Sequence, residues 1–278
     1  MHDFMATLSF SLIPLCTAVV FSIITPPFGA TLSLRNEILL GIALPPAGSA
    51  IIAGAVFAGI PSESTLLLYC ITATALFLLM IALPLSAGTK RVSMRRRELI
   101  LAGIFCFGNT LTMLFMSISP QAEAHFKYLL QGELLAVNTI EFIITVIIVA
   151  VVFIAGWKFR GVVYAYALDE EGLFIKEKSY RLITIMYRAV ATLIITGGII
   201  LIGPLLTTSL LIVPAFLCER HCRGLDLFIG MVIIIGCIGT MAGFFLSLLV
   251  DLPPAPLIIS MVIAAGFFAR FLPNRKKP

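Results

Sequence analysis

Few side chains in this sequence could carry out chemistry, and most of them are isolated within apolar runs. The densest group is Cys218-Glu-Arg-His221-Cys222, which places three potential metal ligands within five residues. Structural zinc sites usually draw four ligands from two spaced pairs. The spacing therefore favours a basic helix end with two incidental cysteines over a metal site, and no metal ligand set can be assigned.

Polar and ionisable residues inside apolar runs are the other candidates, because each is unfavourable in lipid and usually faces a pathway or a partner. Glu133 and Asp251 lie at the ends of their runs, where water softens the penalty. Arg188 lies one or two turns inside its run and could extend its side chain to the nearest membrane surface. Glu141 lies about two turns inside, and we expect it to line an outward-facing cavity.

Sequence motifs of enzymes and nucleotide-binding proteins are missing. The chain has no G-x-x-x-x-G-K-[ST] segment, which is needed to hold the phosphates of ATP. It also has no H-E-x-x-H, G-x-S-x-G or C-x-x-C motif. We therefore predict no catalytic residues and no cofactor bound to this chain.

The composition explains why such residues are scarce. Of the 278 residues, 60% are hydrophobic and 12% are charged, and the mean hydropathy is +1.11. Soluble domains are about half apolar and about a quarter charged, so this chain has too little charge to cover a surface in water. Lipid must be its solvent.

Apolar runs follow one another along the whole chain, and most reach the roughly 20 residues that a helix needs to cross the hydrocarbon layer. The run 204–217 is short and begins at Gly203-Pro204, which predicts a half-span or a broken helix. We therefore expect an all-α polytopic membrane protein, a single domain over 1–278 with eight or nine transmembrane helices. The runs are 5–25, 38–60, 65–85, 98–118, 134–157, 183–202, 204–217, 226–249 and 254–272.

Basic residues orient this bundle. All Lys and Arg except Lys127 and Arg188 fall in alternate connections and in the C-terminal tail. Since Lys and Arg collect in cytoplasmic loops, the N-terminus is expected outside and the C-terminus in the cytoplasm of a multi-pass inner-membrane protein. Membrane topology accounts for the net charge of +5, so nucleic-acid binding is not needed to explain it.

The one sizeable hydrophilic stretch is the cytoplasmic segment 158–182. It contains Asp169, Glu170, Glu171 and Gly172, followed by lysines. A solvated turn is one interpretation. The other is a short helix that lies across the cytoplasmic face and binds a partner, because the segment is long for a helix connection and short for a domain.

Three stretches resemble permeases of the zinc/manganese-type metal ABC transporter family. Leu129-Leu-Gln-Gly-Glu-Leu-Leu-Ala-Val137 is similar to the family's F-G-[DN]-L-L-A-V segment. The segment from Ile202 to Ala215, IGPLLTTSLLIVPA, resembles its V-G-x-L-L-[IV]-[ST]-[AS]-L-L-I-[IV]-P-A signature. Asp251-Leu-Pro-Pro-Ala-Pro-Leu-Ile resembles D-x-P-x-G-P-x-[IV], and Leu168–Gly172 falls where the family has D-P-E.

The resemblance implies a homodimeric permease with one ATPase subunit under each copy, so that ATP and Mg²⁺ bind to the partner. It also implies a substrate-binding protein outside the membrane that delivers a divalent metal. Segment 158–182, with Asp169, Glu170, Glu171 and Gly172, would then couple ATP binding to alternating access in the bundle. The resemblance therefore favours the partner-binding interpretation of this segment.

One departure from the family pattern affects the substrate. Family members carry Asp and His one turn apart in the second span, and Ile42 and Pro46 stand at those positions here. The Pro45-Pro46 pair is also expected to disturb the helix. The chain has three histidines, none of them within an apolar run, so an imidazole site in the transport path is excluded.

Two interpretations of the pathway remain. The substrate could be a metal ion that passes along Asn109, Cys106, Met113 and Met116, with Glu141 near the outer end, in which case sulfur ligands would favour softer metals. Alternatively, the substrate is bulkier or less charged, and these sulfur side chains only pack against helices or lipid. A stand-alone secondary carrier is the alternative function, although it would need titratable residues at mid-membrane and usually an internal repeat. A membrane enzyme or assembly factor is disfavoured by the missing catalytic residues.

Overall fold

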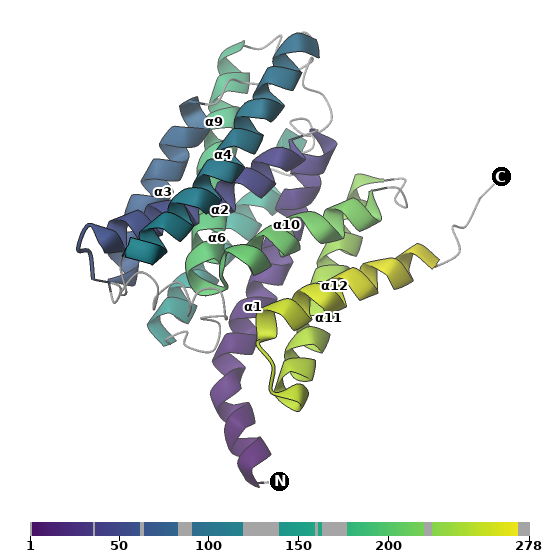
Figure 1. Cartoon of the computed structure of the whole chain (residues 1–278). Coiled ribbons are helices and arrows are strands. Elements are labelled where there is room, and N and C mark those ends of the chain that lie inside the picture. The colour runs from purple at the N-terminus through teal and green to yellow at the C-terminus, as the bar shows by residue number, and fades with distance from the viewer. Residues whose placement is uncertain are drawn as a thin grey trace, which may run out of the picture.

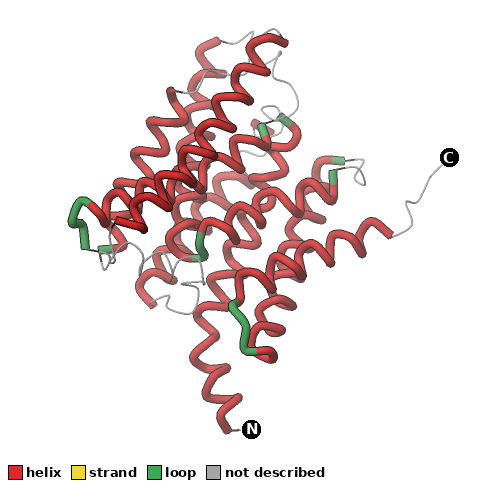
Figure 2. The backbone as a smooth tube through the Cα atoms, viewed as in Figure 1, coloured by secondary structure: helices red, strands yellow, loops and turns green. Residues whose placement is uncertain are grey.

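The computed structural model describes residues 2–35, 37–61, 64–82, 91–118, 139–158, 161–162, 177–219 and 224–271. Within them the chain forms nine helices and no strand (Figures 1 and 2). The helices are α1 (His2–Leu34), α2 (Ile38–Phe57), α3 (Thr65–Ala82), α4 (Arg91–Ile118), α6 (Thr139–Lys158), α9 (Glu177–Leu201), α10 (Pro204–Cys218), α11 (Leu225–Val250) and α12 (Pro254–Phe271).

Each predicted apolar run overlaps one of these helices, so the predicted all-α polytopic membrane fold is confirmed. Five helical stretches are long and apolar enough to cross a membrane: Leu12–Leu34, Ile38–Phe57, Glu98–Ile118, Leu182–Leu201 and Leu225–Val250. Shorter apolar stretches occur in α3, α10 and α12. A helix satisfies all its backbone hydrogen bonds internally, which lipid requires of any segment that it surrounds.

The predicted short helix is confirmed as α10. It has 15 residues and begins directly after Gly203, whose φ of 84° lies in the left-handed region that favours glycine. Pro204 follows at the first helical position, where its missing N–H leaves no hydrogen bond unmade. Fifteen residues span about 22 Å, which is less than the roughly 30 Å of the hydrocarbon layer.

Two boundaries differ from the prediction. The first apolar run was expected to end at residue 25, but α1 continues through Pro26 and Pro27 to Leu34. The predicted cytoplasmic segment 158–182 is shorter than expected, because α9 already begins at Glu177. Its central residues 163–176 lie outside the described residues.

The core forms where α1 lies against α10 and α11, α2 against α4, and α11 against α12. Figure 1 shows α10, α11 and α12 gathered on one side of the bundle and α3, α4 and α9 on the other. Small residues allow the closest approaches. A Cβ atom added to Gly29 of α1 would lie 1.5 Å from the carbonyl oxygen of Leu211 in α10. Gly239 and Gly243 of α11 lie directly against the backbone of α12 at Val262 and Ile258.

Exchanging Gly29 for alanine should therefore force α1 and α10 apart. Backbone atoms cannot rotate out of the way as a flexible side chain can, so we expect Gly29→Ala to destabilise the protein by about 3 kcal/mol or more. Gly230→Ala in α11 is the matched control, because a Cβ atom there meets nothing within 4 Å. Thermal unfolding in detergent measures both variants, and equal melting temperatures would contradict the close α1–α10 contact.

Candidate functional site: the outer face of α4

Helix α4 has one face inside the bundle and one face outside. Leu101 and Thr112 are buried, and a Cβ atom on Gly108 would lie 2.8 Å from the carbonyl carbon of Pro46 in α2. Ser49 of α2 and Thr112 complete this contact through their hydroxyl oxygens, 3.3 Å apart. The buried face of α4 is thus closed against α2.

The predicted pathway residues Cys106, Asn109 and Met113 lie on the opposite, exposed face of α4. Met113 is 73% exposed. Asn109 donates an amide N–H to the carbonyl oxygen of Phe105 at 2.9 Å, and the Thr110 hydroxyl donates to the carbonyl oxygen of Cys106 at 2.8 Å. The structure thus brings three predicted residues onto one face, which points away from the core of this chain.

An exposed amide halfway along a membrane helix is unfavourable against hydrocarbon, because lipid cannot satisfy its remaining N–H and carbonyl oxygen. Beside Asn109 the same face carries four residues at helical spacing: Cys106, Thr110, Met113 and Ser117. The face is therefore more polar than a surface that meets only lipid. We infer that this face meets water or another protein.

The other predicted pathway residues do not join this face. Met116 is half-buried and packs against the core of the bundle. Glu141 belongs to α6, but its side chain lies outside the described residues. Throughout the described part of the chain, no three His, Cys, Asp or Glu residues come together in a way that could hold a metal ion. Cys218 is buried, and His221 and Cys222 lie outside the described residues.

The proline pair in α2 disturbs its hydrogen bonding but does not end the helix. Helix α2 continues through the pair, since it runs from Ile38 to Phe57 with Pro45 and Pro46 buried inside it. Proline has no N–H, so the carbonyl oxygens of Gly41 and Ile42 lose their usual helical donors. Ile42 is half-buried and Pro46 lies beneath α4, so neither position offers a side-chain ligand for a cation.

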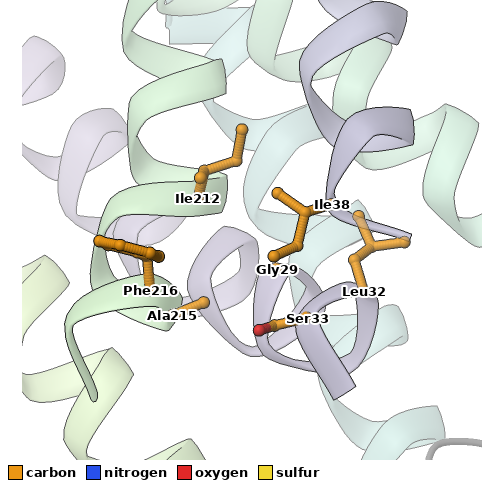
Figure 3. A pocket seen from close by; sticks show the side chains of 7 residues that line it. All are labelled: Gly29, Leu32, Ser33, Ile38, Ile212, Ala215 and Phe216. Carbon is orange, nitrogen blue, oxygen red and sulfur yellow. The ribbon is translucent and has the colours of Figure 1, made fainter. Parts of the chain in front are cut away.

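A small cavity lies where α1, α2 and α10 meet (Figure 3). Its volume of about 10 Å³ is room for roughly one water molecule. The Ser33 hydroxyl is the one polar side chain in an otherwise apolar lining of Gly29, Leu32, Ile38, Ile212, Ala215 and Phe216. A single hydroxyl is too few ligands to hold a divalent cation there.

Polar contacts fasten the helix ends next to that cavity. The Ser33 hydroxyl donates to Glu219 Oε2 at 2.9 Å, which joins the ends of α1 and α10. Arg35 Nε lies 3.6 Å from Glu37 Oε2 in the connection between α1 and α2, and both side chains are buried. A buried pair of this kind is unfavourable to break, because the remaining charge would lose its partner.

This chain matches a known protein family and a solved structure. The model of the ABC 3 transport family matches residues 8–272. The chain belongs to the ABC 3 transport family. The resemblance in its three sequence motifs is therefore confirmed.

A solved structure has the same fold as this ABC 3 family member. It is PsaBC from Streptococcus pneumoniae in complex with Fab, with a TM-score of 0.76 and 17% sequence identity. The match covers 98% of this chain and 95% of the PsaBC chain, so the likeness includes the whole bundle and not one helix hairpin. This family member is thus a multi-pass membrane protein with a transporter fold.

Two residues of α9, Tyr187 and Arg188, are further functional candidates. For Arg188 the structure corrects the prediction, and for Tyr187 it extends it. Arg188 was expected to extend to the membrane surface, but it is 6% exposed and its Nη1 donates to the carbonyl oxygen of Met80 in α3. Tyr187 was not singled out, yet it contacts Phe28 and Thr31 of α1. Sequence spacing could not reveal these contacts because they depend on which helices are neighbours.

The exposed face of α4 can be tested by thiol labelling in a variant without the native cysteines. A hydrophilic reagent attacks the thiolate, which forms in water but rarely in lipid. We expect Asn109→Cys to react about tenfold faster than Ile238→Cys, an exposed position halfway along α11. Equally slow labelling at both positions would contradict contact of the α4 face with water.

Proposed function

We propose that this chain is the membrane-spanning permease subunit of an ATP-binding-cassette importer for a divalent metal ion. Membership of the ABC 3 transport family over residues 8–272 carries the proposal. The sequence contains no Walker A segment, so ATP hydrolysis is assigned to a separate ATPase subunit that binds ATP and Mg²⁺. The chain acts as a single permease unit and not as an enzyme.

The assembly that follows has two copies of this chain, two ATPase subunits and a substrate-binding protein outside the cell membrane. In this arrangement the N-terminus lies outside and the C-terminus in the cytoplasm, in agreement with the distribution of Lys and Arg. The polar face of α4 with Cys106, Asn109 and Met113 then lines the passage between the two copies. That position supplies the contact with water and protein that the Asn109 amide needs.

Substrate choice follows from the donors on that face. A thioether and an amide oxygen are weaker ligands than the carboxylate and imidazole that Ile42 and Pro46 replace, and a thiol that keeps its proton is a poor ligand too. The ion is therefore handed over by the binding protein and passes without a tight resting site in this chain. Conduction of this kind needs binding that is weak enough for the ion to leave.

The ATPase activity of the purified complex tests this function. Binding protein loaded with Zn²⁺ or Mn²⁺ should stimulate ATP hydrolysis, while the same protein treated with a chelator should not. Stimulation by a metal-free organic ligand in place of the ions would reassign the substrate. No co-purifying ATPase, together with uptake driven by an ion gradient, would favour the secondary carrier instead.

The acidic group Asp169, Glu170 and Glu171 is proposed to bind the ATPase next to Gly172. Replacing all three by Asn, Gln and Gln should lower stimulated ATP hydrolysis about tenfold, because charged groups at an interface steer and hold the partner. The control combines Glu98→Gln and Asp226→Asn, two exposed acidic residues at cytoplasmic helix ends. Normal transport by the triple variant would show that the segment is only a solvated connector.

A further inference from the structure

The first half of α9 carries two adjacent side chains that contact two different helices. Tyr187 contacts α1, and Arg188 contacts α3. Successive side chains on a helix point about 100° apart, so one short stretch of α9 can hold two neighbours at once. Figure 1 shows α9 beside α3, and α1 also packs against α9.

The contact with α1 combines ring stacking with a directed hydrogen bond. The rings of Tyr187 and Phe28 are stacked, with centroids 4.7 Å apart and planes at 22°. The Thr31 hydroxyl donates its single proton to the carbonyl oxygen of Phe28 at 2.7 Å. Tyr187 must therefore be the donor in its hydrogen bond with Thr31 Oγ1. This chain of bonds ends in the backbone of α1 at Phe28, directly after its proline pair.

The contact with α3 closes the end of that helix. Met80 lies in the last turn of α3, where carbonyl oxygens have no helical N–H donor. The Arg188 guanidinium donates to the Met80 carbonyl oxygen, and a cation is favourable at the C-terminus of a helix. Because Arg188 is buried, pulling it away from α3 would strip a charge of its partner in an apolar environment.

The position of this pair along α9 suggests its role. Helix α9 begins at Glu177, directly after the segment proposed to bind the ATPase, and Tyr187 lies about 15 Å further along. At its other end α9 packs against α10, where a Cβ atom on Gly198 would lie 2.6 Å from Thr207. Tyr187 and Arg188 are thus contacts in the first half of α9 through which a push on the loop could reach α1 and α3.

We propose that Tyr187 and Arg188 are positioning residues that make α1, α3 and α9 move as one body when the ATPase displaces the cytoplasmic segment. The inference rests on the proposed function, since it needs an ATPase that pushes on α9. Without the two contacts the first half of α9 would move without α1 and α3, and ATP would be hydrolysed without a matching movement of the bundle. The pair thereby determines how much substrate is transported per ATP.

Tyr187→Phe and Thr31→Val test the contact with α1. Phenylalanine keeps the stacking on Phe28 and removes one hydroxyl, so the fold should survive. We expect normal ATPase binding and ATP hydrolysis but about fivefold less substrate transported per ATP, the change in an equilibrium that one buried hydrogen bond produces. The double variant should lose no more than either single variant, because both remove the same bond.

The matched control is Tyr69→Phe. Tyr69 of α3 donates to the carbonyl oxygen of Leu193 in α9 at 3.0 Å, so it joins two of the same helices by the same kind of bond further from the loop. Its transport per ATP should stay at the wild-type value. An equal loss in Tyr69→Phe would overturn the inference, because it would show that any hydrogen bond between α3 and α9 has the same effect on transport.

Arg188→Lys and Arg188→Met test the contact with α3. Lysine keeps the cation and should recover most of the transport that methionine loses, whereas hydrolysis continues in both. If Arg188→Met does not fold, Arg188→Lys and Tyr187→Phe still decide the matter. If Tyr187→Phe and every Arg188 variant that folds transport as much substrate per ATP as the wild type, the inference is wrong but the proposed function stands. If the wild-type complex shows no ATP-dependent transport, the proposed function is wrong too.

A distance measurement checks the common movement directly. Spin labels at Leu78→Cys in α3 and Met186→Cys in α9, both exposed positions, report the separation of the two helices in a variant without the native cysteines. The distance should stay constant when ATP binds to the otherwise wild-type complex and should change in Arg188→Met, which lacks the hydrogen bond to α3. A distance that changes equally in both would contradict movement as one body.

Discussion

Lipid provides no hydrogen-bond partner, and most features of this structure follow from that constraint. Backbone groups are satisfied within helices, and most serine and threonine hydroxyls bond back to a carbonyl oxygen one turn earlier, as Thr17, Thr72 and Thr207 do. Helices then attract one another through close contact more than through the hydrophobic effect, so glycine lies where backbones meet, as at Gly29 and Gly243. Polar groups that cannot be satisfied in this way indicate where the protein meets something other than lipid.

The same reasoning connects three regions of the molecule into one account of transport. Asn109 and its neighbours form a polar face on α4 that needs water or protein beside it. The proposed function assigns ATPase binding to the acidic residues ahead of α9, and Tyr187 and Arg188 connect α9 to α1 and α3. In α2, side chains without donor atoms stand at the positions of the family's metal ligands. Helix α4 packs over one of them, Pro46. In the proposed transport cycle, the partner subunit supplies the driving force for transport, and weak contacts with this chain let the substrate leave.

Hydropathy alone predicted each of the nine helices that the described residues form, because a chain in lipid must be apolar wherever it crosses and few other patterns satisfy that requirement. Local signals misled where tertiary contacts decide the outcome. Pro26 and Pro27 do not end α1, although the first apolar run was expected to end at residue 25. Arg188 does not extend to the surface because the end of α3 lies beside it, which no local pattern reveals. Cys106, Asn109 and Met113 were predicted to line the pathway, but only the packing of α4 against α2 shows that they share an exposed face.

Transport in a reconstituted system tests the central claim most directly. Proteoliposomes would contain this chain with its ATPase, and binding protein loaded with radioactive Zn²⁺ or Mn²⁺ would be added on the side of the N-terminus. The account predicts ion uptake that requires ATP on the side of the C-terminus and that stops when the ATPase is left out. Uptake by this chain alone, driven by a proton or sodium gradient and indifferent to ATP, would contradict it and identify a secondary carrier.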